Sequence, residues 1–415
     1  MRRAIERATW VLLLVLAFLL AGCGGDHHSR ATGSTGADDD AADDDTGPAG
    51  PPNLEFDPTQ MGPFPVGNIT REFRDRSRWD FASRGERRLL VEIWYPAVPT
   101  GDEIPVQHVR DFLNGWDEFI TGLLSWFVDP ADIPNFDQPL FAKRAVPPDR
   151  SKGPYPVVFF SHGNGGVRFQ NWTMCEYLAS HGYVVVSPDH TGNAAFAPFD
   201  DKVVVFDPAL IPKSFWDRFK DLSFLMDQME DLTAEDPKGW LTGMVDPTRV
   251  GVVGHSFGGA TVGEILRQDP RFTAGLLIAG PALPWTSKTY QAAVFHVYNG
   301  EDRTMHDTQW LMDWSYQAAP PPKFRIDCPD SGHYTFTDAC RLIPSLMGNG
   351  DGCGTGERWD GGAPFEFIAY EKAQAILDSY LTAFLGANLS GYASHEQFLW
   401  TNHFPDDIRY QYALP

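Results

Sequence analysis

The hydrophobic positions of the chain gather in short runs, which alternate with longer stretches in which apolar residues recur every three or four positions. The runs are rich in Val, Ile and Phe, as strands buried on both faces require. The longer stretches have the spacing of helices that place one face on a core. We expect strands at 87–97, 155–163, 183–190, 249–256, 271–280, 292–300 and 322–330, and helices at 171–183, 215–232, 257–268 and 364–386.

This alternation predicts an α/β fold with a mostly parallel central sheet and helices on both faces. Sheets of this kind carry their functional groups at the carboxyl ends of the strands. Two segments, near 105–150 and 193–214, do not fit the minimal pattern and are interpreted as insertions into one large domain that covers 53–415.

The first insertion contains the stretch FLNGWDEFITGLLSWF, which we expect to form an amphipathic helix. Its apolar side would pack on the core, or it would serve as a lid or as a wall that faces lipid. The residues on that side are Phe112, Trp116, Phe119, Ile120, Leu123, Leu124 and Phe127.

The N-terminus has the pattern of an export signal. A basic start precedes an apolar stretch that is too short to span a bilayer, and Leu20-Ala21-Gly22-Cys23 at its end resembles a bacterial lipobox. We therefore expect 1–22 to be a signal peptide and Cys23 to be lipidated, which would anchor the protein to the outer membrane or cell surface of a bacterial envelope, outside the cytoplasm. Residues 23–52 are rich in Gly, Ala, Asp and Pro and are expected to be a disordered acidic tether.

The net charge of −22 argues against nucleic acid as a partner. The chain has five cysteines but no C-x-x-C, so a metal site is not expected. With Cys23 lipidated, Cys340 and Cys353 lie in a Gly-rich loop and are the expected disulfide in an oxidising compartment.

The stretch VVGHSFGG places Ser256 between a predicted strand and a predicted helix. In a nucleophile elbow the turn is so tight that only small residues fit two positions before and after the serine, and Gly254 and Gly258 occupy those positions. Ser256 is therefore the candidate nucleophile. The backbone amide of Phe257 at the helix start, and that of Asn164 in the earlier loop FFSHGNGG, are the candidate oxyanion donors.

A serine hydroxyl needs a general base, and in α/β-hydrolases the base follows both the serine and the acid in the chain. His333 lies in a polar Gly turn just after the last predicted strand, where the base belongs. The other histidines after Ser256 lie within a strand, beside the acid loop or beyond the closing helix. They are His296, His306, His395 and His403.

The acid should leave the end of a strand between Ser256 and His333, and NGED after the strand at 292–300 offers two carboxylates. Asp302 fits the Gly-x-Asp turn and is preferred, with Glu301 as the alternative. The acid would orient the imidazole and stabilise its charged form. Weaker candidates are Asp307, Asp327 and Asp330.

The body of the chain resembles the platelet-activating-factor acetylhydrolase family of the plasma or isoform II type. This family includes bacterial relatives that are described as predicted dienelactone hydrolases. The matching stretches are GPFPVGNITREFRD, RRLLVEIWYPA, PVVFFSHGNGG, LASHGYVVVSPDH, RVGVVGHSFGGATV, QDPRFTAGLLIAG and GHYTFTDAC. The resemblance implies an α/β-hydrolase that cleaves ester-linked acyl groups, as a 1-alkyl-2-acetylglycerophosphocholine esterase does, with no cofactor or metal. It assigns the nucleophile to Ser256, the base to His333 and the oxyanion amides to Asn164 and Phe257.

One position departs from this family. The animal plasma enzymes carry their acid after the strand that follows the nucleophile helix, where this chain has Ala279 and Gly280. Either the acid is lost or it lies one strand later, at Asp302, which favours the bacterial branch.

The sequence thus predicts a lipid-anchored serine ester hydrolase that acts on small esters or phospholipids through an acyl-enzyme. Two alternatives stay open within hydrolases: a polyester or cutinase-like enzyme and a dienelactone hydrolase. The alternative from another class is a surface lipoprotein that keeps the fold without catalysis.

Overall fold

The structure is a computed structural model that describes residues 54–101, 104–284, 291–347, 350–359 and 361–414. The expected signal peptide (1–22), the expected tether (23–52) and Cys23 lie outside these residues. Within the described part no helix is long and apolar enough to cross a membrane.

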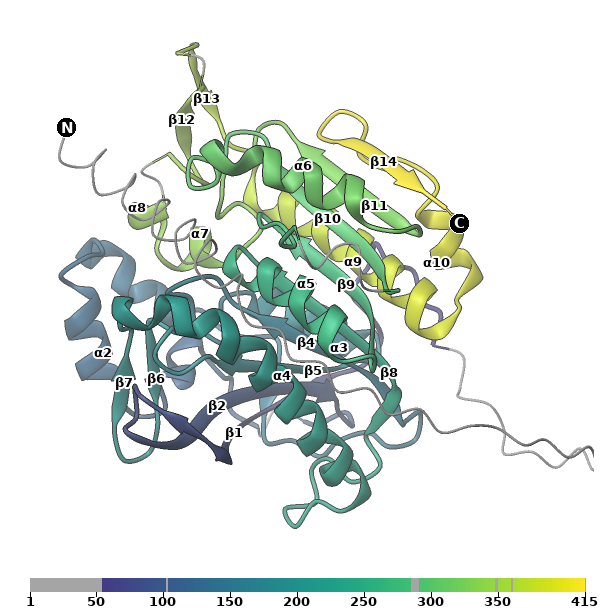
Figure 1. Ribbon diagram of the computed structural model, residues 1–415. Coiled ribbons are helices and arrows are strands. Elements are labelled where there is room, and N and C mark those ends of the chain that lie inside the picture. The colour runs from purple at the N-terminus through teal and green to yellow at the C-terminus, as the bar shows by residue number, and fades with distance from the viewer. Residues whose placement is uncertain (1–53, 102–103, 285–290, 348–349, 360, 415) are drawn as a thin grey trace, which may run out of the picture. The chain divides into compact units, whose positions relative to one another are not determined.

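A ten-stranded sheet forms the centre of the domain (Figure 1), in the order β14-β11-β10-β9-β8-β4-β5-β2-β1-β3. The pairs from β11 through β5 in this order are parallel, whereas β2 pairs antiparallel with both β5 and β1, and β14 pairs antiparallel with β11. The strands are β1 Val66–Asp80, β2 Gly85–Pro96, β3 Lys143–Arg144, β4 Tyr155–Ser161, β5 Val184–Asp189, β8 Val245–His255, β9 Phe272–Ile278, β10 Ala293–Asn299, β11 Lys323–Cys328 and β14 Arg409–Ala413.

Successive side chains of the central strands enter two different cores, because a strand turns its residues to opposite faces of a sheet. In β4, Val158 and Phe160 join the core on one face, and Val157 and Phe159 join the core on the other. The first core is covered by α3 (Trp172–Ser180) and α9 (Tyr370–Ser390), and the second by α4 (Ile211–Ala234) and α5 (Phe257–Gln268). The expected α/β arrangement with helices on both faces is confirmed.

The remaining elements are short and lie in connections. The helices are α2 Asp117–Leu124, α6 Gln309–Ala318, α7 Ala339–Leu342, α8 Pro344–Met347 and α10 Ala393–Phe398, with 3-10 turns η1 Val109–Leu113, η2 Pro130–Asp137, η3 Pro208–Leu210 and η4 His306–Thr308. Two small hairpins are formed by β6 Phe196–Pro198 with β7 Val203–Val205, and by β12 Thr355–Glu357 with β13 Pro364–Glu366.

The single amphipathic helix expected over 112–127 is wrong. Asn114 (φ 54°) and Gly115 (φ 80°) adopt left-handed backbone conformations, so the segment divides into η1 and α2. Phe112 and Ile120 are buried in the core, but Phe119 and Phe127 are exposed. The expected closing helix also begins later, at Tyr370, because 364–366 form β13 instead.

Candidate active site

Ser256 occupies a strained turn between β8 and α5. Its backbone has φ 56° and ψ −115°, which non-glycine residues rarely adopt. A Cβ on Gly254 would lie 2.2 Å from the Gly258 carbonyl oxygen, and a Cβ on Gly258 would lie 1.9 Å from that of Ser161. The two glycines are therefore required by close backbone approach, and the Ser256 side chain remains partly exposed.

His333 and Asp302 complete a hydrogen-bonded chain with this serine. His333 Nε2 lies 2.9 Å from Ser256 Oγ, and His333 Nδ1 lies 2.8 Å from Asp302 Oδ2. Asp302 follows β10 and His333 follows β11, so neighbouring parallel strands deliver both side chains to the same edge of the sheet. The structure brings together the nucleophile, base and acid proposed from the sequence.

The charge of Asp302 controls the imidazole. Burial alone would lower the pKa of His333, but the attraction of the Asp302 carboxylate and its hydrogen bond outweigh burial, and the pKa is raised above its usual 6.5. Burial raises the pKa of Asp302, while His333 acts in the opposite direction. The Nδ1–H donates to Asp302, so Nε2 is left to accept the serine proton.

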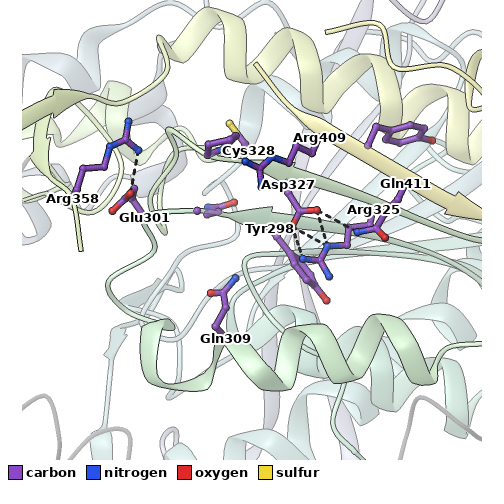
Figure 2. Close-up of a pocket in the computed structure, with 13 residues that line it drawn as sticks. Tyr298, Glu301, Gln309, Arg325, Asp327, Cys328, Arg358, Arg409 and Gln411 are labelled. Carbon is purple, nitrogen blue, oxygen red and sulfur yellow. Dashed lines mark hydrogen bonds and ion pairs between the residues drawn. The ribbon is translucent and has the colours of Figure 1, made fainter. Parts of the chain in front are cut away.

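Glu301, the alternative acid, points elsewhere. Its carboxylate accepts hydrogen bonds from Arg358 Nη1 at 3.1 Å and from the Trp359 backbone at 3.0 Å. Figure 2 shows it directed at Arg358. Both residues line a cavity of about 550 Å³, and Ser256, His333 and Asp302 do not line it. Asp327, on the same cavity, binds Arg325. The cavity side of this loop is thus separate from the serine, and of the two carboxylates Asp302 is the one that binds the His333 imidazole.

The amides of the three glycines around Asn164 have hydrogen-bond acceptors within the part of the chain that the structure describes, whereas that of Asn164 does not. Gly163 N–H donates to Gln170 Oε1, Gly165 N–H to the Asn193 carbonyl, and Gly166 N–H to the Gly163 carbonyl. Among the described residues, no acceptor is recorded for the N–H of Asn164 or of Phe257. These are the two amides expected to face the oxyanion.

Two positioning residues were missed from the sequence. His255, next to the serine, donates from Nε2 to the His333 carbonyl at 2.8 Å, and burial lowers its pKa to about 3, so it is neutral. Asp351 accepts from the His333 and Arg303 backbone amides at 2.9 and 2.8 Å. The place of His255 between Gly254 and Ser256 was a usable signal, but no local pattern marked Asp351.

A disulfide joins Cys340 and Cys353, the pair expected from the sequence. It closes the loop that carries Asp351, and this loop also accepts hydrogen bonds from Tyr334 N–H and the Thr335 hydroxyl. The disulfide therefore supports the turn on which His333 lies. Cys175 and Cys328 are free and buried, and the described residues contain no group of three side chains that could hold a metal ion.

Comparison with known proteins agrees with this geometry. The family model described as "Alpha/beta hydrolase family" matches residues 157–398, which is more than half of the chain and includes the serine, the acid and the base. The chain belongs to the alpha/beta hydrolase family. Within it, the model "Platelet-activating factor acetylhydrolase, isoform II" matches residues 58–205 of this alpha/beta hydrolase.

Individual relatives of this alpha/beta hydrolase are distant. A probable 1-alkyl-2-acetylglycerophosphocholine esterase of Arthroderma benhamiae is 24% identical over 327 residues, which cover 69% of this chain and 77% of that protein. The platelet-activating factor acetylhydrolase of Gallus gallus is 27% identical over 235 residues, 48% of this chain and 53% of that enzyme. The chain thus spans about half the length of the chicken enzyme and is a hydrolase that resembles these esterases.

Among solved structures, the ferulic acid esterase from Streptomyces cinnamoneus superposes with a TM-score of 0.63 at 23% identity. The alignment covers 84% of this chain and 96% of that one. At this identity the likeness establishes the alpha/beta hydrolase fold.

Proposed function

We propose that the protein is a serine carboxylic ester hydrolase that acts through Ser256, His333 and Asp302. The observation that carries the proposal is the continuous chain from Ser256 Oγ to His333 Nε2 (2.9 Å) and from His333 Nδ1 to Asp302 Oδ2 (2.8 Å), built on a strained elbow. Each distance allows a proton to pass or a charge to be stabilised without rearrangement.

The reaction begins when Ser256 Oγ attacks the ester carbonyl and its proton moves to His333 Nε2. The carbonyl oxygen becomes an oxyanion that accepts hydrogen bonds from the amides of Asn164 and Phe257. His333, now charged and paired with Asp302, gives its proton to the alcohol oxygen as the C–O bond breaks. The alcohol leaves, and the acyl group remains on Ser256.

Water completes the cycle by the same steps. His333 takes a proton from water, whose oxygen attacks the acyl-enzyme carbonyl, and the oxyanion forms again at the same two amides. The proton on His333 then returns to Ser256 Oγ as the acid departs. The chain's own residues supply every proton transfer in this scheme.

For the substrate we propose an ester-linked acyl group on a phospholipid or a similar lipid. The match to the acetylhydrolase family model and the names of the fungal and animal relatives support this class. The exposed fractions of Phe119 (51%), Trp126 (84%) and Phe127 (71%) also favour it, because three large apolar side chains exposed within a short stretch of the chain suit a lipid partner. The acid at Asp302 rather than at the Ala279 position supports the bacterial branch of the family.

The lipobox-like stretch that ends at Cys23 supports a further part of the proposal, a lipid anchor on the outside of a bacterial cell. Membrane fractionation of the parent and Cys23→Ser proteins tests it. Equal release of both into the soluble fraction would refute the anchor without touching the esterase.

The esterase is tested with purified residues 53–415 on p-nitrophenyl butyrate and on a short-acyl phospholipid. We expect hydrolysis of both, and a loss of about 10⁴-fold or more in kcat for Ser256→Ala. A fluorophosphonate should label the parent at Ser256 and leave the variant unlabelled. Equal rates for parent and variant would refute the role of Ser256. No labelling of the parent would favour the non-catalytic alternative.

A further inference from the structure

A second Ser–His–Asp chain begins at Ser161, directly before the loop 162–166 that carries Asn164, here called the oxyanion loop. Ser161 Oγ is 3.0 Å from His190 Nε2, and His190 Nδ1 is 2.9 Å from Asp221 Oδ2. The connectivity equals that of Ser256, His333 and Asp302. All three residues are 0% exposed, however, so an ester cannot reach Ser161. This chain needs a different explanation from catalysis.

The serine of this second chain is contacted by Arg218 of α4, which is also 0% exposed. Nη1 donates to the His162 carbonyl at 2.5 Å and to Ser161 Oγ at 3.2 Å. Nη2 donates to the Gly163 carbonyl at 2.9 Å and to Asn193 Oδ1 at 2.7 Å. These acceptors are uncharged, and two of them are consecutive carbonyls of the oxyanion loop. The hydrogen bonds of this buried cation therefore go to backbone carbonyls and to neutral side chains.

The Gly163 carbonyl receives a second donor from His162. The His190 backbone N–H donates to His162 Nε2 at 3.1 Å, so the imidazole proton is on Nδ1, which lies 2.7 Å from the Gly163 carbonyl oxygen. Burial first, and then the Arg218 charge, hold the pKa of His162 well below its usual value. His162 thus stays neutral, and it and Arg218 fix the direction of one carbonyl.

That direction decides where the next amide points. The Gly163–Asn164 peptide is planar and trans, so the Asn164 N–H points opposite to the Gly163 carbonyl. With the carbonyl held in the interior, the N–H is turned outward. Hydrogen bonds from a cation to the carbonyl also polarise the peptide, which makes its N–H a stronger donor.

Arg218 reaches the other parts of the same hole as well. Asn193, held by its guanidinium, donates to Asn164 Oδ1 at 2.8 Å and accepts from the Gly165 backbone amide at 3.0 Å. On its other side the guanidinium carbon lies 4.8 Å from the ring centroid of Phe257, whose amide is the second oxyanion donor.

We propose that Arg218 is the positioning residue of the oxyanion hole: it clamps the His162 and Gly163 carbonyls, braces Phe257, and so aims the Asn164 amide at the ester carbonyl. The inference rests on the proposed esterase function. Ser161, His190 and Asp221 are the scaffold of this clamp. Burial first, and then Arg218, lower the pKa of His190 to about 3, so the second chain does not take up a proton in the neutral range.

The test compares Arg218→Met with Arg218→Lys and with the parent. We expect Arg218→Met to lower kcat on p-nitrophenyl butyrate by about 10- to 100-fold while KM changes by less than about threefold, since an oxyanion donor acts mainly on the transition state. A trifluoromethyl ketone, which adds to the serine and forms an oxyanion, should lose affinity by a similar factor. Arg218→Lys keeps the charge and should recover part of both losses.

Arg168→Met is the matched control, because Arg168 is equally buried but donates to Glu92, Asp189 and the Phe112 carbonyl instead. It should lower thermal stability while kcat and ketone affinity per folded molecule stay within about threefold of the parent. Equal kcat in Arg218→Met and the parent, or an equal loss in Arg168→Met, would overturn the inference.

If Arg218→Met does not fold, Arg218→Lys decides alone. A parallel fall of kcat and ketone affinity supports the clamp, and unchanged ketone affinity overturns it. A parent protein that neither hydrolyses esters nor reacts with a fluorophosphonate would refute the proposed function, and this inference with it. An active parent with an equally active Arg218→Met variant would refute only the clamp.

Discussion

At the scale of single residues, two adjacent carboxylates of one turn, Glu301 and Asp302, bind different partners. Asp302 binds His333, whereas Glu301 binds Arg358, as Figure 2 shows for the second pair. The sequence favoured Asp302 through its Gly-x-Asp turn but left Glu301 as an alternative, because the choice depends on which way each side chain leaves the turn. The partner that takes up Glu301 lies 57 residues further along the chain.

Replacement of these two carboxylates should therefore have unequal effects. We expect Asp302→Asn to reduce kcat by about 10²- to 10⁴-fold, because the imidazole loses its orientation and the stabilisation of its charge. Glu301→Gln, the matched control, should stay within about threefold of the parent. Steady-state kinetics of both variants on one ester measure this. A larger loss in Glu301→Gln would reverse the assignment.

The same pair sets the pH dependence of the rate. His333 must be neutral to accept the serine proton, and its pKa is raised, so the parent should gain activity as pH rises through a midpoint above the usual 6.5. In Asp302→Asn, burial becomes the main influence on the pKa of His333 and lowers it. The midpoint of the residual activity should therefore move to lower pH. A pH profile of kcat/KM checks this shift. An unmoved midpoint would mean that another group controls the profile.

At the scale of elements, the loop closed by the Cys340–Cys353 disulfide holds the turn that carries the base. Asp351 accepts hydrogen bonds from the backbone of His333 and from that of Arg303, so it links the turn that carries His333 to the turn that carries Asp302. The disulfide was predictable from the Gly-rich sequence around its two cysteines. The structural role of the loop was not predictable, since it depends on contacts with a turn that lies earlier in the chain.

Removal of this disulfide should affect both stability and rate. We expect the Cys340→Ser/Cys353→Ser double variant to lose about 3 kcal/mol of unfolding free energy, the scale for closing a loop of this length. Its kcat should fall by about three- to tenfold as Asp351 loses its fixed place. Calorimetry and ester kinetics measure the two effects. Reductant should change the parent in the same direction and leave the double variant unchanged. A parent insensitive to complete reduction would contradict this.

The insertion at 105–150 shows what periodicity alone misses. Every third or fourth residue from Phe112 to Phe127 is apolar, so the pattern favoured a single helix. Asn114-Gly115 is a turn signal, and both residues adopt positive φ. The local backbone preference prevails over the pattern, and part of the apolar side is consequently turned to solvent.

At the scale of the whole molecule, the alternating strands and helices of the parallel core were predictable, because their buried residues are apolar on both faces. β1 was not, since its sequence is dense in charges. These charges pair with side chains from other elements, as Glu72 does with Arg88 and Arg71 with Asp236. The ion pairs of β1 thus add charged residues between its buried Ile69 and Phe73 and interrupt the apolar run by which the other strands were recognised.

Global stability should depend on pH through Glu176, which lies on α3 with 4% exposure. Burial raises the pKa of its carboxyl to about 8 from 4.5, so the folded state holds this proton more tightly than the unfolded chain does. The stabilisation is complete below pH 4.5 and is lost as pH rises through about 8.

Glu176→Gln mimics the protonated carboxyl at every pH. We expect it to melt within about one degree of the parent at pH 4.5 and several degrees higher at pH 8. Exposed Glu357→Gln is the matched control and should show no such divergence. Thermal melts at both pH values measure the effect. A melting-temperature difference between Glu176→Gln and the parent that does not change with pH would rule out this carboxyl as the source of the pH dependence.

The duplicated Ser–His–Asp chain has a consequence for finding active sites by shape. A search of the described residues for three side chains at triad distances returns both chains, and their hydrogen-bond lengths differ by only a tenth of an ångström. Each imidazole has an aspartate beside it, but the two chains differ in their surroundings: in the buried chain the Arg218 guanidinium also lies 3.2 Å from the serine hydroxyl, and burial keeps His190 neutral. One array can change its net charge during a reaction, and the other holds its charge fixed and therefore holds its shape.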